Sequence, residues 1–214
     1  MKKRDEITVM LVDDHPVVRD GYRRLLEGAP DVRVVAELDS GEAACQKYTS
    51  VQPDVVVLDL NMPGMGGLEA LRRIRAKDPE ARILVFSMHD SQTMVKRAVE
   101  AGAAGFLTKS SAASQMLEAV RQVAQGLSFL NHHLVPNLFN PRSASGDPVQ
   151  QLSKREFQIF RDLAAGKSVQ EIADILSISP KTVGVHQTNI MKKLKLRNAA
   201  ELTRLAIRSG VIEA

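Results

Sequence analysis

The sequence predicts a doubly wound α/β domain with a five-stranded parallel sheet, followed by a smaller all-α domain. In the first part of the chain, short apolar runs alternate with stretches of helical spacing, and from Leu152 onwards the strand-like runs stop. The runs are continuous in Val, Ile and Leu, which is typical of parallel strands buried on both faces. Strands that alternate with helices in this way indicate a sheet covered by helices on two sides.

The five strands and their helices follow in order along the chain. We predict strands at residues 7–12, 32–38, 54–60, 82–88 and 105–109, and helices at residues 16–28, 41–48, 66–78, 91–102 and 111–126. The helical stretches repeat apolar residues at helical spacing, as in Leu68, Leu71 and Ile74. In a sheet of order 2-1-3-4-5, the first and third strands are neighbours, and ligands bind beyond the carboxyl ends of the strands.

Four short helices are predicted after the strands end. They cover residues 152–166, 168–176, 181–194 and 198–210. Ser153 stands three residues before Glu156, which is the pattern of a capping box, and Gly210 closes the last helix. Two short helices joined by the tight turn at 177–179, with Pro180 at the first position of the next helix, form a helix-turn-helix.

Charge and composition divide the chain into two domains. We place an α/β domain at residues 1–125, a linker with a short helix near 132–139 at residues 126–150, and the helical domain at residues 151–214. Residues 1–147 contain 18 Lys and Arg against 19 Asp and Glu, whereas residues 148–214 contain 11 against 6. A near-neutral first part and a basic second part indicate that only the second part binds a polyanion.

The composition also excludes some classes of protein. No apolar run approaches the roughly 20 residues that cross a membrane, and acids stand near the start where a signal peptide would have its apolar core. The single cysteine, Cys45, precludes an internal disulfide and fits a reducing compartment. We therefore expect a cytoplasmic protein without a membrane partner.

Acidic residues stand where predicted strands end. Asp13 and Asp14 follow the first strand and Asp59 ends the third, so the expected strand order brings them side by side. Carboxylates so close repel one another, and clustered oxygen ligands with room for water suit Mg²⁺, which relieves that repulsion. Ser87 and Lys109 end the fourth and fifth strands on the same rim. The alternative is that Asp13 or Asp14 only caps the helix that follows.

Four segments together resemble the receiver domain of two-component response regulators, which has a flavodoxin-like fold. They are "VDDHP" (12–16), "LDLNMPGMGG" (58–67), "FSMHD" (86–90) and "GFLTK" (105–109), and the resemblance spans residues 7–125. It implies that Asp59 is the phosphoacceptor. The other residues that it implies are the Mg²⁺-binding acids Asp13 and Asp14 with the backbone carbonyl of Asn61, the phosphoryl partners Lys109 and Ser87, and the aromatic switch residue Phe106. Many members have Pro after this lysine, where the chain has Ser110.

The helical domain resembles the LuxR/NarL-type DNA-binding domain along its whole length. Its most specific part is "KTV..H...I..KL", and residues 177–200 carry five Lys and Arg and no acid. The alternative is that this basic run is only a solvated helix end. The resemblance implies DNA contacts by Lys181, Thr182 and His186, base-facing positions at Val185 and Thr188, and a basic run that includes Lys192 and Lys193. Gly184 departs from the polar or basic residue common at its position.

The two resemblances together imply a phosphorylation-controlled transcription regulator of the NarL/FixJ type, not an enzyme. A sensor histidine kinase would donate the phosphoryl group, and a phosphorylated homodimer would bind double-stranded promoter DNA. Leu202, Leu205 and Ala206 share one face of the last helix and are the expected pairing face.

Two alternatives stay open. One is a DNA-binding regulator that never becomes phosphorylated. The other is an Asp-nucleophile phosphatase of the dehalogenase type, which would carry Asp-x-Asp after its first strand, whereas "DLN" follows the third strand here. Turnover of a small phosphate ester would distinguish the phosphatase.

Overall fold

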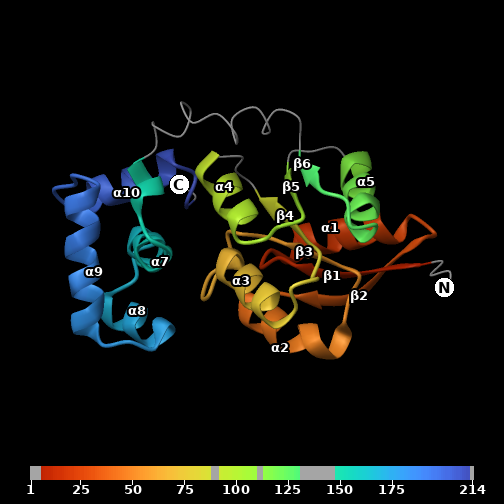
Figure 1. Ribbon diagram of the computed structural model, residues 1–214, viewed down its shortest axis with the longest axis horizontal. Coiled ribbons are helices and arrows are strands. Elements are labelled where there is room, and N and C mark those ends of the chain that lie inside the picture. The colour runs from red at the N-terminus through yellow and green to blue at the C-terminus, as the bar shows by residue number, and fades with distance from the viewer. Residues whose placement is uncertain (1–5, 88–91, 110–112, 131–147, 213–214) are drawn as a thin grey trace. The chain divides into compact units, whose positions relative to one another are not determined.

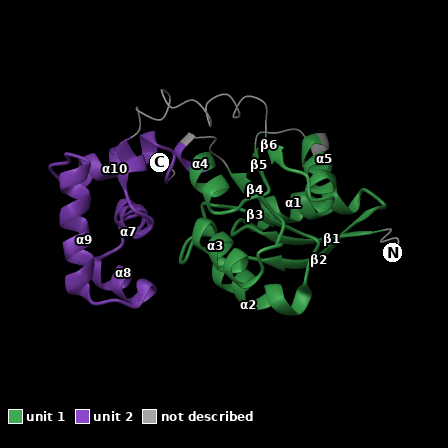
Figure 2. Cartoon of the chain, viewed as in Figure 1, with its two compact units in different colours: residues 1–90, 95–135 green, residues 91–94, 136–214 purple. Residues whose placement is uncertain are grey.

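A computed structural model describes residues 6–87, 92–109, 113–130 and 148–212 of the chain (Figure 1). The chain divides into two compact units, residues 1–90 with 95–135 and residues 91–94 with 136–214, which Figure 2 shows in different colours. The predicted short helix near 132–139 lies outside the described residues. Among the helices that the structure describes, none combines the length and the apolar character needed to cross a bilayer.

Six parallel strands form one sheet in the order β2-β1-β3-β4-β5-β6. Their bounds are β1 (Ile7–Val12), β2 (Val32–Leu38), β3 (Val55–Leu58), β4 (Ile83–Ser87), β5 (Gly105–Thr108) and β6 (Phe129–Leu130). The predicted order is therefore confirmed for the first five strands. Every residue of β3 and β4 is buried, as expected for central strands that are covered on both faces.

The sixth strand is one that the sequence pattern does not predict. β6 is only two residues long, too short to show a periodicity, and it lies inside the predicted linker. It pairs with β5 through Gly105 and Phe129, and Phe129 packs against the apolar core. A Cβ on Gly105 would lie 2.8 Å from the carbonyl oxygen of Phe129, so the missing side chain permits the pairing. The sheet thus extends past residue 125.

Helices cover both faces of this sheet (Figure 1). In the described part of this unit the helices are α1 (Pro16–Glu27), α2 (Gly41–Val51), α3 (Gly67–Lys77), α4 (Gln92–Glu100) and α5 (Ala113–Ala124). On one face, Leu26 of α1 and Val120 of α5 pack with Val57 of β3 in one core cluster. Leu71 and Ile74 of α3 are fully buried outside that cluster, and α3 contacts α2.

Glycine shapes the loop between β3 and α3. Gly64 and Gly66 have φ angles of 71° and 73°, in the left-handed region that other residues rarely adopt. At Gly67 a Cβ would collide with the carbonyl group of Asp59, so the start of α3 can approach this point only without a side chain. The Gly67 N–H donates to the Leu60 carbonyl at 3.2 Å. The loop therefore brings its backbone close to Asp59.

Within residues 148–212, the second unit contains a short 3-10 helix and four α-helices. They are η2 (Pro148–Gln151), α7 (Lys154–Ala164), α8 (Val169–Leu176), α9 (Pro180–Lys193) and α10 (Ala199–Arg208). The predicted capping box is present, because Ser153 and Glu156 each accept the other's backbone N–H. Ser177 ends α8 with a φ of 52°, and Pro180 opens α9. The four helices and the helix-turn-helix are therefore confirmed.

The apolar face of α10 packs inside this unit, which corrects one prediction. Leu202, Leu205 and Ala206 are at most 5% exposed, and α10 contacts α7. These side chains stabilise the unit by removing apolar surface from water. They are therefore not a free face on which two copies could pair.

Candidate functional site

The carboxyl ends of β1, β3 and β5 bring three charged side chains together. Asp13 follows β1, Asp59 follows β3 and Lys109 follows β5. The Asp59 N–H donates to the carbonyl of Val12 at 2.9 Å, which continues the pairing of β1 and β3 to the site. The Lys109 Nζ lies 2.6 Å from Asp13 Oδ2 and 2.7 Å from Asp59 Oδ2. The side chains of Asp13, Asp59 and Lys109 are 3%, 1% and 6% exposed, so this is a buried ion pair with two acids.

Burial and the ion pair act in opposite directions on the ionisation of these groups. Burial raises the pKa of the Asp59 carboxyl. Two groups offset part of that rise: the Lys109 ammonium, and the Asn61 N–H, which donates to Asp59 Oδ1 at 3.0 Å. Burial alone would lower the pKa of Lys109, but its hydrogen bonds to Asp13 and Asp59 outweigh burial and raise it. Lys109 therefore stays protonated at neutral pH and balances one of two carboxylates.

The acids that remain unbalanced fit a divalent cation. Asp13, Asp14, His15 and Asp59 each offer one ligand atom, and these atoms lie within 4.8 Å of one another. Clustered carboxylate oxygens are the ligands that Mg²⁺ prefers. The capping alternative is weaker, because the N-cap residue of α1 is His15 and no side chain caps the helix there. The backbone N–H that Asp13 Oδ1 accepts is that of His15, the N-cap residue, at 2.8 Å.

Ser87 and Phe106 lie on one face of the sheet. In the pairing of β4 with β5, Val85 stands beside Phe106 and Ser87 stands beside Thr108, so Ser87 and Phe106 are diagonal neighbours. Leu107 points to the opposite face, into the cluster beneath α1 and α5. Ser87 and Phe106 are 1% and 0% exposed. The Ser87 side chain and the Phe106 ring therefore lie buried on the same face of the sheet, as diagonal neighbours.

Two further groups contact the acidic cluster, and the sequence reasoning missed both. His15 Nδ1 lies 3.3 Å from Asp13 Oδ1 and 3.0 Å from Asp14 Oδ1. The guanidinium of Arg19 donates to the Asp13 carbonyl at 2.6 Å. Their positions in the sequence could have indicated both contacts. His15 is adjacent to the acids. Arg19 lies one turn into α1, and from there its long side chain reaches back to the end of β1.

A row of exposed side chains follows one side of α9 in the second unit. With about 3.6 residues per turn, Lys181, Val185, Thr188 and Lys192 fall on the same side of the helix. All four are exposed, and Val185 is 55% exposed. The opposite side carries Val183 and Ile190, which are fully buried. We call the set Lys181, Val185, Thr188 and Lys192 the α9 strip.

Three predicted DNA contacts lie off the α9 strip. The Thr182 hydroxyl is 2.8 Å from the hydroxyl of Ser179, the N-cap of the helix. His186 is half-buried and shares its side of the helix with the buried Ile190. The Lys193 Nζ donates to the carboxylate of Glu156 at 2.7 Å, and that carboxylate is 7% exposed. The structure therefore does not place these three residues with the other four.

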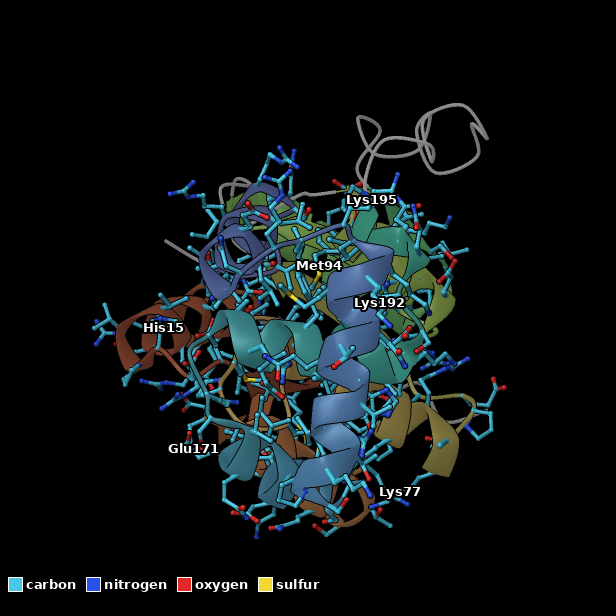
Figure 3. The ribbon with its side chains drawn as sticks, turned by 90° about the vertical axis from the view of Figure 1, so that its left-hand side faces the viewer. His15, Lys77, Met94, Glu171, Lys192 and Lys195 are labelled. Atoms are coloured by element: carbon cyan, nitrogen blue, oxygen red, sulfur yellow. The ribbon has the colours of Figure 1, made fainter. Side chains whose placement is uncertain are left out.

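A hollow beside the strip adds two cations that the predicted set of contacts did not include. Thr188 and Lys192 line it together with Lys195 and Arg197 from the loop after α9. Figure 3 shows Lys192 near the end of α9 and Lys195 just beyond it. Lys195 has a φ of 54°, so the chain turns sharply at the end of the helix. The basic surface therefore continues from the helix into the loop.

Comparison with known families agrees with both units. Residues 9–121 match the response regulator receiver domain, and residues 150–206 match the luxR family of bacterial regulatory proteins. The acidic cluster lies in the first match and the α9 strip in the second. Receiver domains bind Mg²⁺ at such an acidic pocket, which agrees with the donor set described above.

Similar proteins match across nearly the whole chain. Response regulator GacA of Pseudomonas viridiflava is 36% identical over 212 residues, 97% of this chain and 99% of that protein. Response regulator UvrY of Escherichia coli strain K12 is also 36% identical, over 97% of both chains.

Among solved structures, RcsB from Salmonella enterica serovar Typhimurium, bound to the promoter P1flhDC in the presence of the phosphomimetic BeF3−, is 28% identical. The match has a TM-score of 0.75 and covers 94% of this chain and 98% of that one. The chain therefore belongs to the two-component response regulators of the NarL/FixJ type, transcription regulators that join a receiver domain to a LuxR-type DNA-binding domain.

Proposed function

We propose that Asp59 is the phosphoacceptor through which a sensor histidine kinase controls DNA binding by this protein. The observation that carries the proposal is the Lys109 ammonium held between the carboxylates of Asp13 and Asp59 where the strands end. A carboxylate is a known covalent nucleophile in phosphoryl transfer, and a fixed ammonium can pair with the phosphorylated product. The family relationship supports the same assignment.

In the proposed reaction, an Asp59 carboxylate oxygen attacks the phosphorus atom of a phosphohistidine on the kinase. A P–O bond forms, the P–N bond to the imidazole breaks, and the imidazole nitrogen takes up a proton. The carboxylates of Asp13, Asp14 and Asp59 with the Asn61 carbonyl would hold Mg²⁺, which supplies positive charge to the phosphoryl oxygens when bound. Lys109 would pair with one phosphoryl oxygen and the Ser87 hydroxyl would donate to another.

The proposed partner of the second unit is double-stranded promoter DNA. The two lysines of the α9 strip suit backbone phosphates, and Val185 and Thr188 between them are short enough to reach base edges. The structure of RcsB on a promoter with a phosphomimetic supports this partner for the present chain. Phosphorylation would favour a homodimer that binds two half-sites, in the cytoplasm and without catalytic turnover of its own.

The proposal is tested by DNA binding with and without phosphorylation. The full chain, incubated with acetyl phosphate and Mg²⁺, is used to select a duplex from a random library. That duplex should bind the treated protein more tightly than the untreated protein. Equal affinity in the two states would favour the regulator that acts without phosphorylation, and failure to bind any duplex would contradict DNA binding itself.

Replacing Ser87 by Ala should separate phosphorylation from its consequence. The acceptor and its acidic neighbours stay intact, so Asp59 should still become phosphorylated. The variant lacks the hydroxyl that would couple phosphorylation to the position of Phe106. We expect weaker phosphorylation-dependent dimerisation, measured by sedimentation with and without acetyl phosphate. Ser50→Ala, an exposed hydroxyl in α2, is the control and should respond as the unchanged protein does. An equal response of all three proteins would remove Ser87 from the coupling.

Replacing Lys192 and Val185 should distinguish phosphate contact from base reading. Lys192→Ala should weaken binding to the selected duplex and to random DNA alike and lower the salt slope by about one unit, because a compact charge suits a phosphate. Val185→Ala should weaken the selected duplex alone, by about 1–3 kcal/mol, the range typical of one base contact. Binding isotherms on both duplexes at several salt concentrations measure these effects.

Lys154→Ala is the matched control for these two variants. Lys154 is an exposed lysine at the start of α7, outside the α9 strip, and its loss changes the net charge as Lys192→Ala does. It should leave the affinity for both duplexes and the salt slope unchanged. The assignment fails if Lys192→Ala loses discrimination while Val185→Ala weakens both duplexes equally.

A further inference from the structure

Gly184 occupies a position in α9 where nothing in the described chain requires a glycine. It lies inside the helix Pro180–Lys193, where glycine is among the least favourable residues. It is not among the glycines with a positive φ, so the backbone conformation at this position does not require glycine. Apart from its two chain neighbours and the nearby helix backbone, a Cβ built on it would have no described atom within 4 Å, so packing does not exclude a side chain either.

The surroundings of Gly184 point to a ligand outside the chain. Gly184 stands three residues after Lys181 and four before Thr188, so it adjoins the α9 strip. The Thr188 hydroxyl donates to the Gly184 carbonyl at 3.0 Å, which ties the polar end of this exposed side chain back to the helix. Its methyl group and the exposed Val185 are then the groups free to meet a ligand. The middle of the strip therefore presents short, apolar groups, with a lysine at each end.

We infer that Gly184 lets α9 approach base edges closely, so that Val185 and the Thr188 methyl group read the 5-methyl groups of thymine. The inference rests on the proposed DNA binding and adds the chemistry of the bases that are read. The thymine methyl is the apolar group that a base pair presents in the major groove, whereas its other groups there are hydrogen-bond donors and acceptors. The apolar surface formed by Val185 and the Thr188 methyl group matches the thymine methyl, and glycine permits the close backbone approach that methyl contact needs.

Removing the methyl groups from the DNA tests this directly. The duplex selected by the full chain with acetyl phosphate and Mg²⁺ is synthesised again with deoxyuridine in place of thymidine, which deletes the methyl groups and keeps every hydrogen bond. Affinity should fall about threefold to fourfold for each contacted thymine, the effect of one buried carbon group. A random duplex with the same replacement should bind as before. Equal affinity for the thymidine and deoxyuridine versions of the selected duplex would overturn the inference.

A matched pair of glycine variants tests the close approach. Gly21 in α1 also lies inside a helix with nothing described within 4 Å of a Cβ, so Gly21→Ala and Gly184→Ala should both raise the melting temperature. Only Gly184→Ala should weaken binding to the selected duplex, by about fivefold, the low end of one base contact.

The outcomes separate this inference from the proposed function. If Gly184→Ala binds the selected duplex as the unchanged protein does, the close approach is wrong although DNA binding stands. If the full chain binds no duplex at all, both the proposed function and this inference are overturned. Loss of affinity for random DNA equal to that for the selected duplex would also contradict the inference, because it would assign Gly184 to backbone contact.

Discussion

Replacing Asp59 by Asn should abolish the phosphoryl adduct that acetyl phosphate and Mg²⁺ produce on this protein. The amide removes the nucleophilic oxygen while keeping the shape of a side chain that is 1% exposed. Intact-mass spectra of the unchanged protein should show a single phosphoryl adduct, and the variant should show none. Chelation of the metal should remove the adduct from the unchanged protein as well, because the carboxylates would then lack the cation that screens them.

Two control variants sharpen this experiment. Asp39→Asn changes an exposed acid outside the acidic cluster and should leave the adduct unchanged. Asp14→Asn keeps the acceptor but removes one candidate metal ligand, so phosphorylation should require more Mg²⁺. An adduct that persists in Asp59→Asn would show that Asp59 is not the phosphoacceptor.

Replacing Lys109 by Met should destabilise the receiver domain by about 3–5 kcal/mol at neutral pH without Mg²⁺, as expected when one partner of a buried ion pair is lost. The ammonium lies within 2.7 Å of both Asp13 and Asp59, and its loss leaves two buried carboxylates facing each other. Urea unfolding followed by tyrosine fluorescence measures the effect in this domain alone. Tyr22 and Tyr48 are the two tyrosines of the chain, which has no tryptophan.

The pH dependence of this loss has a definite sign. Burial already raises the pKa of Asp59, and without the Lys109 ammonium the folded-state pKa rises further above the unfolded value of about 4. A group with a raised folded pKa costs stability once it ionises, so the penalty is largest above the folded pKa and shrinks as the pH falls towards the unfolded pKa. Added Mg²⁺ should restore part of the stability at neutral pH.

An exposed lysine supplies the control. Lys47→Met in α2 removes the same charge from an exposed position and should change the free energy of unfolding little. Equal stability of Lys109→Met and Lys47→Met at neutral pH would show that the buried ion pair does not hold the acidic cluster together.

Most of the receiver fold could be predicted because central parallel strands must be apolar on both faces. Runs such as Val55–Leu58 are therefore visible in the sequence, and the helices between them show their own spacing. The strand β6 could not be predicted, since two residues carry no period and its pairing depends on the missing side chain of Gly105. The burial of Leu202 inside its own unit could not be predicted either, because an apolar helix face in the sequence does not indicate which surface packs against it.

The acidic cluster was predictable for a similar reason. A charged residue directly after a buried strand is costly unless it meets a partner, and the strand order indicates which strand ends meet. The partners themselves depend on side-chain reach. That Lys109 bridges Asp13 and Asp59, and that Arg19 holds the Asp13 carbonyl, follow only from the folded arrangement.

By itself, the sequence determined that α9 is the basic helix of a helix-turn-helix and named seven candidate contacts on it. Only the tertiary structure separated them. Lys192 and Lys193 are adjacent, chemically identical and both exposed. Lys192 lies on the strip, whereas the Lys193 Nζ donates to Glu156, 37 residues earlier in the chain. The physical reason is that neighbouring residues on a helix point about 100° apart, so packing against α7 decides which lysine stays free for a ligand.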